Sequence, residues 1–156
     1  MKNARIFFLA HVISLFLIAG YAYPASFSLK TQPKSVNMGI IIADDYQNGY
    51  KEKIQANLLQ INSNQDDWKV MVKTNDSSMG VMGSHTKPIS DLYWRAQGTY
   101  ATQTVYTNIA NYDIEVARGP KGSIKNLFID YKVLLSWTRD VPGAYYITLL
   151  YTLTTQ

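Results

Sequence analysis

Apolar and polar residues alternate along the last thirty residues of the chain, in the runs 127–137 and 145–153. Because successive side chains of a β-strand point to opposite faces of a sheet, each run predicts a strand with one buried face. The intervening Val141-Pro142-Gly143-Ala144 is typical of a type II turn. The pattern therefore predicts a terminal β-hairpin. Its expected core side chains are Leu127, Ile129, Tyr131, Val133, Leu135, Trp137, Tyr145, Ile147, Leu149, Tyr151 and Leu153.

Shorter alternating runs precede this hairpin and are separated by turn-forming residues. They lie at 27–29, 36–42, 68–72, 89–94 and 112–116. Short strands of this kind, without a convincing helix, favour two packed sheets over a barrel. The predicted fold class is all-β, an antiparallel two-sheet immunoglobulin-like β-sandwich of about eight strands.

One segment, Lys51–Ile61, fits two kinds of secondary structure. Ile54, Leu58 and Ile61 have the spacing of a helical stripe. Ile54, Ala56 and Leu58 have the spacing of one face of a strand. The strand is the favoured interpretation.

The N-terminus has the features of a secretory signal peptide. Two basic residues precede an apolar stretch, Ile6–Ile18, and small residues follow in Gly20-Tyr21-Ala22. The stretch is shorter than the roughly 20 residues that a membrane-spanning helix needs. We predict a signal peptide at 1–22 and a single β-sandwich domain at 23–156, with no membrane span after cleavage.

Charge and cysteine content narrow the expected partners. Removal of Lys2 and Arg5 with the signal peptide lowers the formal net charge from +4 to +2, which gives no basis for nucleic-acid binding. The chain has no cysteine, so its stability must come from sheet hydrogen bonds and apolar burial rather than from disulfides. We expect an exported protein, located in the periplasm, at the cell surface or in the extracellular medium.

No set of residues in the chain obliges a particular chemistry. His85 is the only histidine after position 22, and no Gly-x-Ser-x-Gly nucleophile motif accompanies it. The acid pairs Asp44-Asp45 and Asp66-Asp67 lack the Asp-x-Asp-x-Asp-Gly spacing of a calcium loop. We therefore expect no catalytic residue, no metal site and no cofactor, in a protein that is not an enzyme.

Aromatic side chains are the best candidates for binding a partner. The chain has 12 tyrosines and 3 tryptophans, and such side chains can stack on sugar rings or anchor a protein interface. In a β-sandwich, most of them belong to the core or to cross-strand pairs. Tyr93, Tyr100, Tyr106 and Tyr146 fall off the strongest apolar stripes and are the predicted exposed binding residues.

Four short segments resemble secreted bacterial surface β-sandwich proteins. They are Asp67–Val72, Ile89–Arg95, Pro142–Tyr145 and Leu150–Thr154. The chain resembles WxL-type cell-surface domains and, more loosely, fimbrial or spore-coat-U-like subunits.

WxL domains carry two Trp-x-Leu motifs, the second near the C-terminus, and are associated with non-covalent attachment to peptidoglycan. The matching positions here are Trp68-Lys69-Val70 and Tyr151-Thr152-Leu153, and each departs from the motif at one residue. The resemblance implies Trp68 and Tyr151 as binding residues, and a cell-wall polysaccharide or an envelope protein as the partner.

The leading hypothesis is a non-catalytic secreted or cell-surface structural and binding protein, attached non-covalently to the cell envelope. An alternative is a pilus or fibre subunit that self-associates, in which Ala25–Thr31 completes the sheet of a neighbour by β-strand addition. Its motive is the early alternation of Phe27 and Leu29, which is also typical of an ordinary first strand. A carbohydrate-binding module with exposed aromatic residues is a further alternative.

Overall fold

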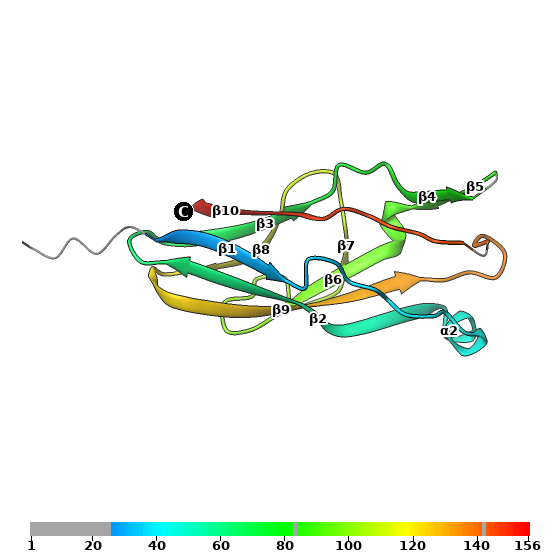
Figure 1. The fold of residues 1–156 in the computed structure, drawn as a ribbon, viewed down its shortest axis with the longest axis horizontal. Helices are drawn as coiled ribbons and strands as arrows, with labels where there is room; N and C mark the ends of the chain where they lie inside the picture. Colours follow the sequence, from blue (N-terminus) through cyan, green and yellow to red (C-terminus); the bar gives the residue numbers. More distant parts are fainter. Residues whose placement is uncertain (1–25, 83, 142) are drawn as a thin grey trace, which may run out of the picture.

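The computed structural model describes residues 26–82, 84–141 and 143–156 (Figure 1). The predicted signal peptide lies outside these residues. The described chain is all-β with almost no helix, and its antiparallel strands form sheets of five, three and two strands. The all-β class predicted from the sequence is therefore confirmed, with ten described strands in place of about eight.

The five-stranded sheet has the order β1-β2-β9-β6-β7. Its strands are β1 (Phe27–Gln32), β2 (Tyr50–Ser63), β9 (Gly122–Leu134), β6 (Leu92–Gln97) and β7 (Thr107–Asn108). The long strands β2 and β9 pair antiparallel along most of their length. The ambiguous segment of the sequence lies within β2, so the strand interpretation is confirmed. Among the described strands, β1 lies at an edge and pairs with β2 alone.

The three-stranded sheet has the order β10-β3-β8. Its strands are β10 (Leu150–Thr155), β3 (Trp68–Lys73) and β8 (Ile114–Gly119). The remaining two strands, β4 (Ser78–Met82) and β5 (His85–Pro88), form a hairpin near one end of the elongated molecule (Figure 1).

One of the predicted strands, 36–42, has no regular secondary structure in the described chain. The run 36–42 has no ladder partner among the described residues and leads into α2 (Ala43–Asn48); a 3₁₀ turn, η1, covers Ile89–Asp91. Asp45 explains the start of α2, because its carboxylate accepts a hydrogen bond from the Ile42 backbone N–H at 2.9 Å. The prediction of a strand over 36–42 is therefore wrong.

The predicted terminal hairpin is also wrong. β9 lies between β2 and β6 in the five-stranded sheet, whereas β10 pairs with β3 in the three-stranded sheet. After β9 the chain turns and crosses to the other sheet (Figure 1). Alternation tells which face a strand buries but not which strand it pairs with. Two strands from facing sheets therefore look like hairpin partners in the sequence.

One half of the predicted hairpin core is buried, and the other half is only partly so. The alternate residues of Leu127–Leu135 are buried in the core. The alternate residues of Tyr145–Leu153 pack against that core but remain partly exposed. Trp137 is 63% exposed, so its assignment to the core is wrong. It lies beyond the end of β9 and stacks on Tyr46 of α2, with ring centroids 4.4 Å apart.

Candidate functional site

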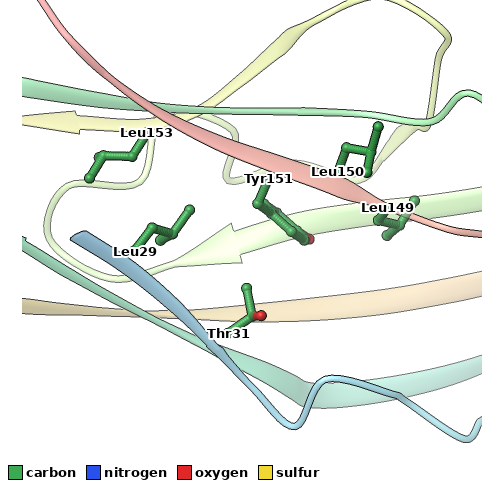
Figure 2. A pocket seen from close by; sticks show the side chains of 6 residues that line it. All are labelled: Leu29, Thr31, Leu149, Leu150, Tyr151 and Leu153. Carbon is green, nitrogen blue, oxygen red and sulfur yellow. The ribbon is translucent and has the colours of Figure 1, made fainter.

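The candidate site is a groove between β1 in one sheet and β10 in the other (Figure 2). It encloses about 340 Å³. Figure 2 shows the side chain of Tyr151 reaching between its two walls. The lining residues are Leu29, Thr31, Leu149, Leu150, Tyr151 and Leu153.

A larger cavity of about 710 Å³ continues the groove toward the end of the molecule that carries α2. One wall comes from the segment 33–41, which follows β1, and the other from 143–149, which precedes β10. Leu92 and Val133 of the five-stranded sheet contribute to its floor. Three residues line both cavities, which makes them parts of one groove: Thr31, Leu149 and Tyr151.

A chain of hydrogen bonds crosses the floor of the groove. Asn57 Nδ2 donates to the backbone carbonyl of Pro33 at 2.5 Å, and Asn57 Oδ1 accepts from the hydroxyl of Tyr131 at 2.7 Å. The hydroxyl oxygens of Tyr131 and Tyr151 are 2.9 Å apart. Since Tyr131 has one hydroxyl hydrogen and gives it to Asn57, Tyr151 must be the donor in this last bond. Tyr151 Oη therefore retains capacity only as an acceptor.

The environment of the two tyrosines raises the pKa of both. Burial raises the pKa of Tyr131 from its ordinary value of 10.0 to about 12. The pKa of Tyr151 rises well above its ordinary value, first because of burial and then because of the charge and hydrogen bond of Tyr131. Both hydroxyls consequently keep their protons at neutral pH, and the direction of the hydrogen-bond chain is maintained.

The edge of β10 that borders the groove has no backbone partner among the described residues. Leu150–Thr155 pair with β3 through the opposite edge. In addition, Thr154 Oγ1 is buried and has no hydrogen-bond partner in the described chain. An open strand edge of this kind is a template for pairing with a further strand.

A buried ion cluster lies at the α2 end of the groove. Lys87 Nζ donates to Asp91 at 3.0 Å, to Asp140 at 2.8 Å and to the backbone carbonyl of Leu134 at 2.8 Å. These three acceptors use all three hydrogens of the ammonium group. The cluster therefore ties β5 to the turn that follows β9, where the chain crosses between sheets.

Two of the predicted binding residues, Trp68 and Tyr100, pack against each other. Trp68 is 1% exposed, and its indole N–H donates to the backbone carbonyl of Pro120 at 3.0 Å. The rings of Trp68 and Tyr100 meet edge to face, with centroids 5.7 Å apart. Lys125 Nζ lies 5.3 Å from the ring centroid of Tyr100. A tryptophan buried to this degree cannot stack on a ligand, so its role in this structure is packing.

Tyr93 and Tyr106 lie at the five-stranded sheet beside Lys132, whose Nζ is 5.6 Å and 4.3 Å from their ring centroids. The Tyr106 hydroxyl donates to the carboxylate of Glu52. Tyr146 is 74% exposed and lines the wider part of the groove. The structure thus brings Tyr146 and Tyr151 to the groove and leaves the other four predicted residues elsewhere.

Two other kinds of site find no support in the described chain. No group of three or more His, Asp or Glu side chains within it is placed to hold a metal ion. None of its helices has the length and apolar character needed to cross a membrane.

Comparisons with known proteins place the fold. No family model matches the chain, and no curated protein matches it in sequence. A chain from a chaperone–usher pilus structure that reveals the molecular basis of rod uncoiling is 13% identical, with a TM-score of 0.52 over 88% of this chain and 91% of that chain. The P pilus rod subunit PapA is 15% identical, with a TM-score of 0.53 over 86% of this chain and 100% of that chain.

At these identities the likeness shows a shared fold. The chain therefore has a fold similar to that of pilus rod subunits, in agreement with its fimbrial resemblance. The resemblance to WxL-type and spore-coat-U-like proteins stays a prediction.

Proposed function

We propose that this protein is a non-catalytic subunit of a cell-surface fibre and that it assembles when a β-strand of a second copy adds to β10. The observation that carries the proposal is the open edge of β10 beside an apolar groove. An added strand would gain backbone hydrogen bonds along that edge and bury its alternate side chains, which is how strand addition combines affinity with specificity. The fold shared with pilus rod subunits supports the same conclusion.

We infer further that the two larger sheets form an immunoglobulin-like sandwich with one strand position open. Such a sandwich has strands A, B, E and D in one sheet and C, F and G in the other. The order β1-β2-β9-β6 follows A-B-E-D, and the pair β3 and β10 follows C and F. The position of strand G, beside β10, is where the groove lies.

We propose Ala25–Thr31 of the second copy as the added strand. Ala25, Phe27 and Leu29 share one face of this segment and are apolar, and Leu29 can meet the apolar lining of the groove at Leu153. In the described chain, Phe27–Gln32 forms β1, which is the ordinary first strand that the sequence also allowed. Four of its six side chains are exposed and, among the described strands, it pairs only with β2, so its release costs less than that of a strand paired on both edges. A copy that releases β1 loses Leu29 and Thr31 from one wall of its groove and keeps the other wall, Leu149, Tyr151 and Leu153.

The remaining elements of the proposal come from the sequence. A signal peptide at 1–22 would export the subunit, and the residues after it would form the fibre. The proposal assigns the protein no catalytic activity and no cofactor.

The absence of cysteine from the chain makes strand addition measurable by cross-linking. Two variants of residues 23–156 are prepared separately, one with Lys30→Cys and the other with Thr152→Cys. Both positions are exposed, and the two proteins are mixed under mild oxidation. If the added strand runs antiparallel to β10 with position 31 beside 151, position 30 lies beside 152. A disulfide-linked dimer of the two variants is then expected, because neighbouring strands bring the cysteines within reach.

Ser28→Cys mixed with Thr152→Cys is the matched control. Position 28 would lie two residues farther along the strand, beyond the Cα separation of at most about 7 Å that a disulfide tolerates. A mixture in which neither pair cross-links, with a wild-type protein that stays monomeric in sedimentation at high concentration, would refute strand addition by this segment.

A further inference from the structure

The floor of the groove contains a hydrogen-bond acceptor, which a strand with only apolar side chains would leave unpaired. The carbonyl of Pro33 can only accept, so the amide of Asn57 is oriented by it. This orientation makes Tyr131 a donor to Asn57 and Tyr151 a donor to Tyr131. The chain of hydrogen bonds therefore ends at Tyr151 Oη, which presents acceptor lone pairs beside the groove.

No other described group hydrogen bonds to the Tyr151 hydroxyl. Thr31 of the same chain lines the opposite wall but makes no hydrogen bond to Tyr151 within the described residues (Figure 2). While the groove is open, water can serve this acceptor. A strand that displaces the water must supply a donor, because a buried acceptor left unpaired opposes binding.

The surroundings of Tyr151 are apolar on both sides. Leu149 and Leu153 lie two residues before and after it and line the same groove. The groove therefore presents an apolar position, an acceptor and an apolar position in sequence. A matching strand needs a hydroxyl or amide donor at one position and apolar side chains at alternate positions beside it.

The proposed added strand has the donor of this pattern and the apolar residue on one side of it. Phe27 and Leu29 are followed on the same face by Thr31, whose hydroxyl can donate. In the antiparallel register with Leu29 beside Leu153, Thr31 lies beside Tyr151, and Phe27 lies beside Thr155, beyond the residues that line the groove. A shift by two residues would set Leu29 against the unpaired acceptor or Thr31 against an apolar position, so those registers are disfavoured.

We propose that Tyr151 is the specificity-determining residue of the groove and that its hydroxyl accepts a hydrogen bond from Thr31 of the second copy, which selects the register of the added strand. This inference rests on the proposed function and deepens it. It concerns the choice among registers, whereas strand addition itself depends on the edge of β10 and the apolar lining.

The test measures binding of a fluorescein-labelled peptide of residues 23–32 to the protein of residues 23–156, by fluorescence anisotropy. Replacing Thr31 with valine in the peptide keeps its shape and removes the donor. Against the wild-type protein we expect the valine peptide to bind roughly three- to tenfold more weakly, the effect of one net hydrogen bond. A Thr31→Ser peptide, which keeps the hydroxyl, should retain the preference.

Against Tyr151→Phe the threonine and valine peptides should bind equally. Tyr112→Phe is the matched control, since Tyr112 is 67% exposed and is not among the residues that line the groove, and it should leave the preference for threonine intact. A preference that survives in Tyr151→Phe would overturn the role of Tyr151 and leave strand addition standing. Failure of every peptide to bind the wild-type protein would overturn the role of Tyr151 together with the choice of Ala25–Thr31 as the added strand.

Discussion

The two edges of the three-stranded sheet differ in whether another segment of the chain covers them. At β8, the segment 100–103 covers the outer edge, because Thr102 and Gln103 donate to the carbonyl of Val116 and Arg118 donates to the carbonyl of Tyr100. At β10, the outer edge has no backbone partner among the described residues. One edge is closed by the protein itself, and the other is open.

This difference bears on function because an exposed strand edge is an aggregation hazard that proteins usually cover. The segment that closes β8 shows that this chain can cover an edge of the same sheet. At β10, by contrast, the edge borders an apolar groove with a defined acceptor at Tyr151. An open edge with a specific lining suits a selective partner better than indiscriminate association.

The largest expected effect comes from the ion cluster near the open side. Lys87→Met would leave Asp91 and Asp140 buried without their cation, so we expect a loss of about 3–5 kcal/mol in the free energy of unfolding, measured by urea denaturation. Arg139→Met is the control, because Arg139 is 60% exposed and lies 4.0 Å from Asp91. It should cost at most about 1 kcal/mol, and equal losses would contradict the role assigned to Lys87.

The tyrosine pair in the groove floor predicts a loss of stability in alkali. Between pH 10 and about 12, the unfolded chain releases the Tyr131 proton while the folded chain keeps it, because burial raises the folded pKa. The contribution of Tyr131 to the free energy of unfolding should therefore be constant below pH 10 and fall by about 3 kcal/mol as the pH approaches 12. Urea denaturation across this range measures the fall.

Tyr131→Phe should reduce this alkaline loss and leave the part that comes from Tyr151, although it lowers stability at neutral pH by leaving Asn57 Oδ1 without its donor. An unchanged alkaline slope in Tyr131→Phe would show that another group, such as Tyr151, causes the loss.

Gly119→Ala is expected to loosen the closed edge. A Cβ at this position would lie 2.7 Å from Trp68 Cζ2 and 2.8 Å from Tyr100 Cδ1. Trp68 is buried and has no room to move, so we expect a cost of about 1–3 kcal/mol and displacement of Tyr100 from β8. Hydrogen exchange should quicken at the amides of Thr102 and Arg118 and stay unchanged in β10. Arg118→Ala, at an exposed side chain, should leave exchange at Thr102 unchanged.

The sequence predicts which strand faces are buried better than it predicts which strands pair. Alternation identified the buried faces of β3 and β9, because burial of one strand face depends on the strand's own residues. It could not identify the pairing of β10 with β3, because pairing depends on segments far apart in the chain. The segment 100–103 has no strong alternation of apolar and polar residues, so the sequence does not predict its role as a cover for β8.

The sequence does not predict the groove, for a related reason. A strand that lines an open groove needs alternate apolar residues, and so does a strand that lines a closed core, so Leu29 and Leu149 look the same in either case. The motif that predicts Tyr151 as a binding residue also predicts Trp68, which is buried. The motif therefore did not separate binding from packing. Asn57 and Tyr131 gain their roles only when the fold brings their polar atoms together.

The smallest expected effect distinguishes the two edges most directly. Thr154 Oγ1 of β10 is buried without a partner in the described chain, whereas Thr102 Oγ1 at the closed edge donates to the carbonyl of Glu115 at 3.4 Å. In the monomer, Thr154→Val should be neutral or stabilising by up to about 1 kcal/mol, because it removes an unpaired buried hydroxyl. Thr102→Val should be neutral or slightly destabilising. Thermal denaturation of the two variants measures both effects.

Assembly then tests why the unpaired hydroxyl is tolerated at β10. If an added strand supplies a partner for Thr154, Thr154→Val should slow assembly in sedimentation while its monomer is at least as stable as the wild type. Thr102→Val should assemble at the wild-type rate, because the closed edge takes no part. In the proposed register, Ser28 of the added strand lies beside Thr154. If Thr154→Val assembled as fast as the wild type, the Thr154 hydroxyl would have no partner in the fibre, and the unpaired hydroxyl would no longer support this register.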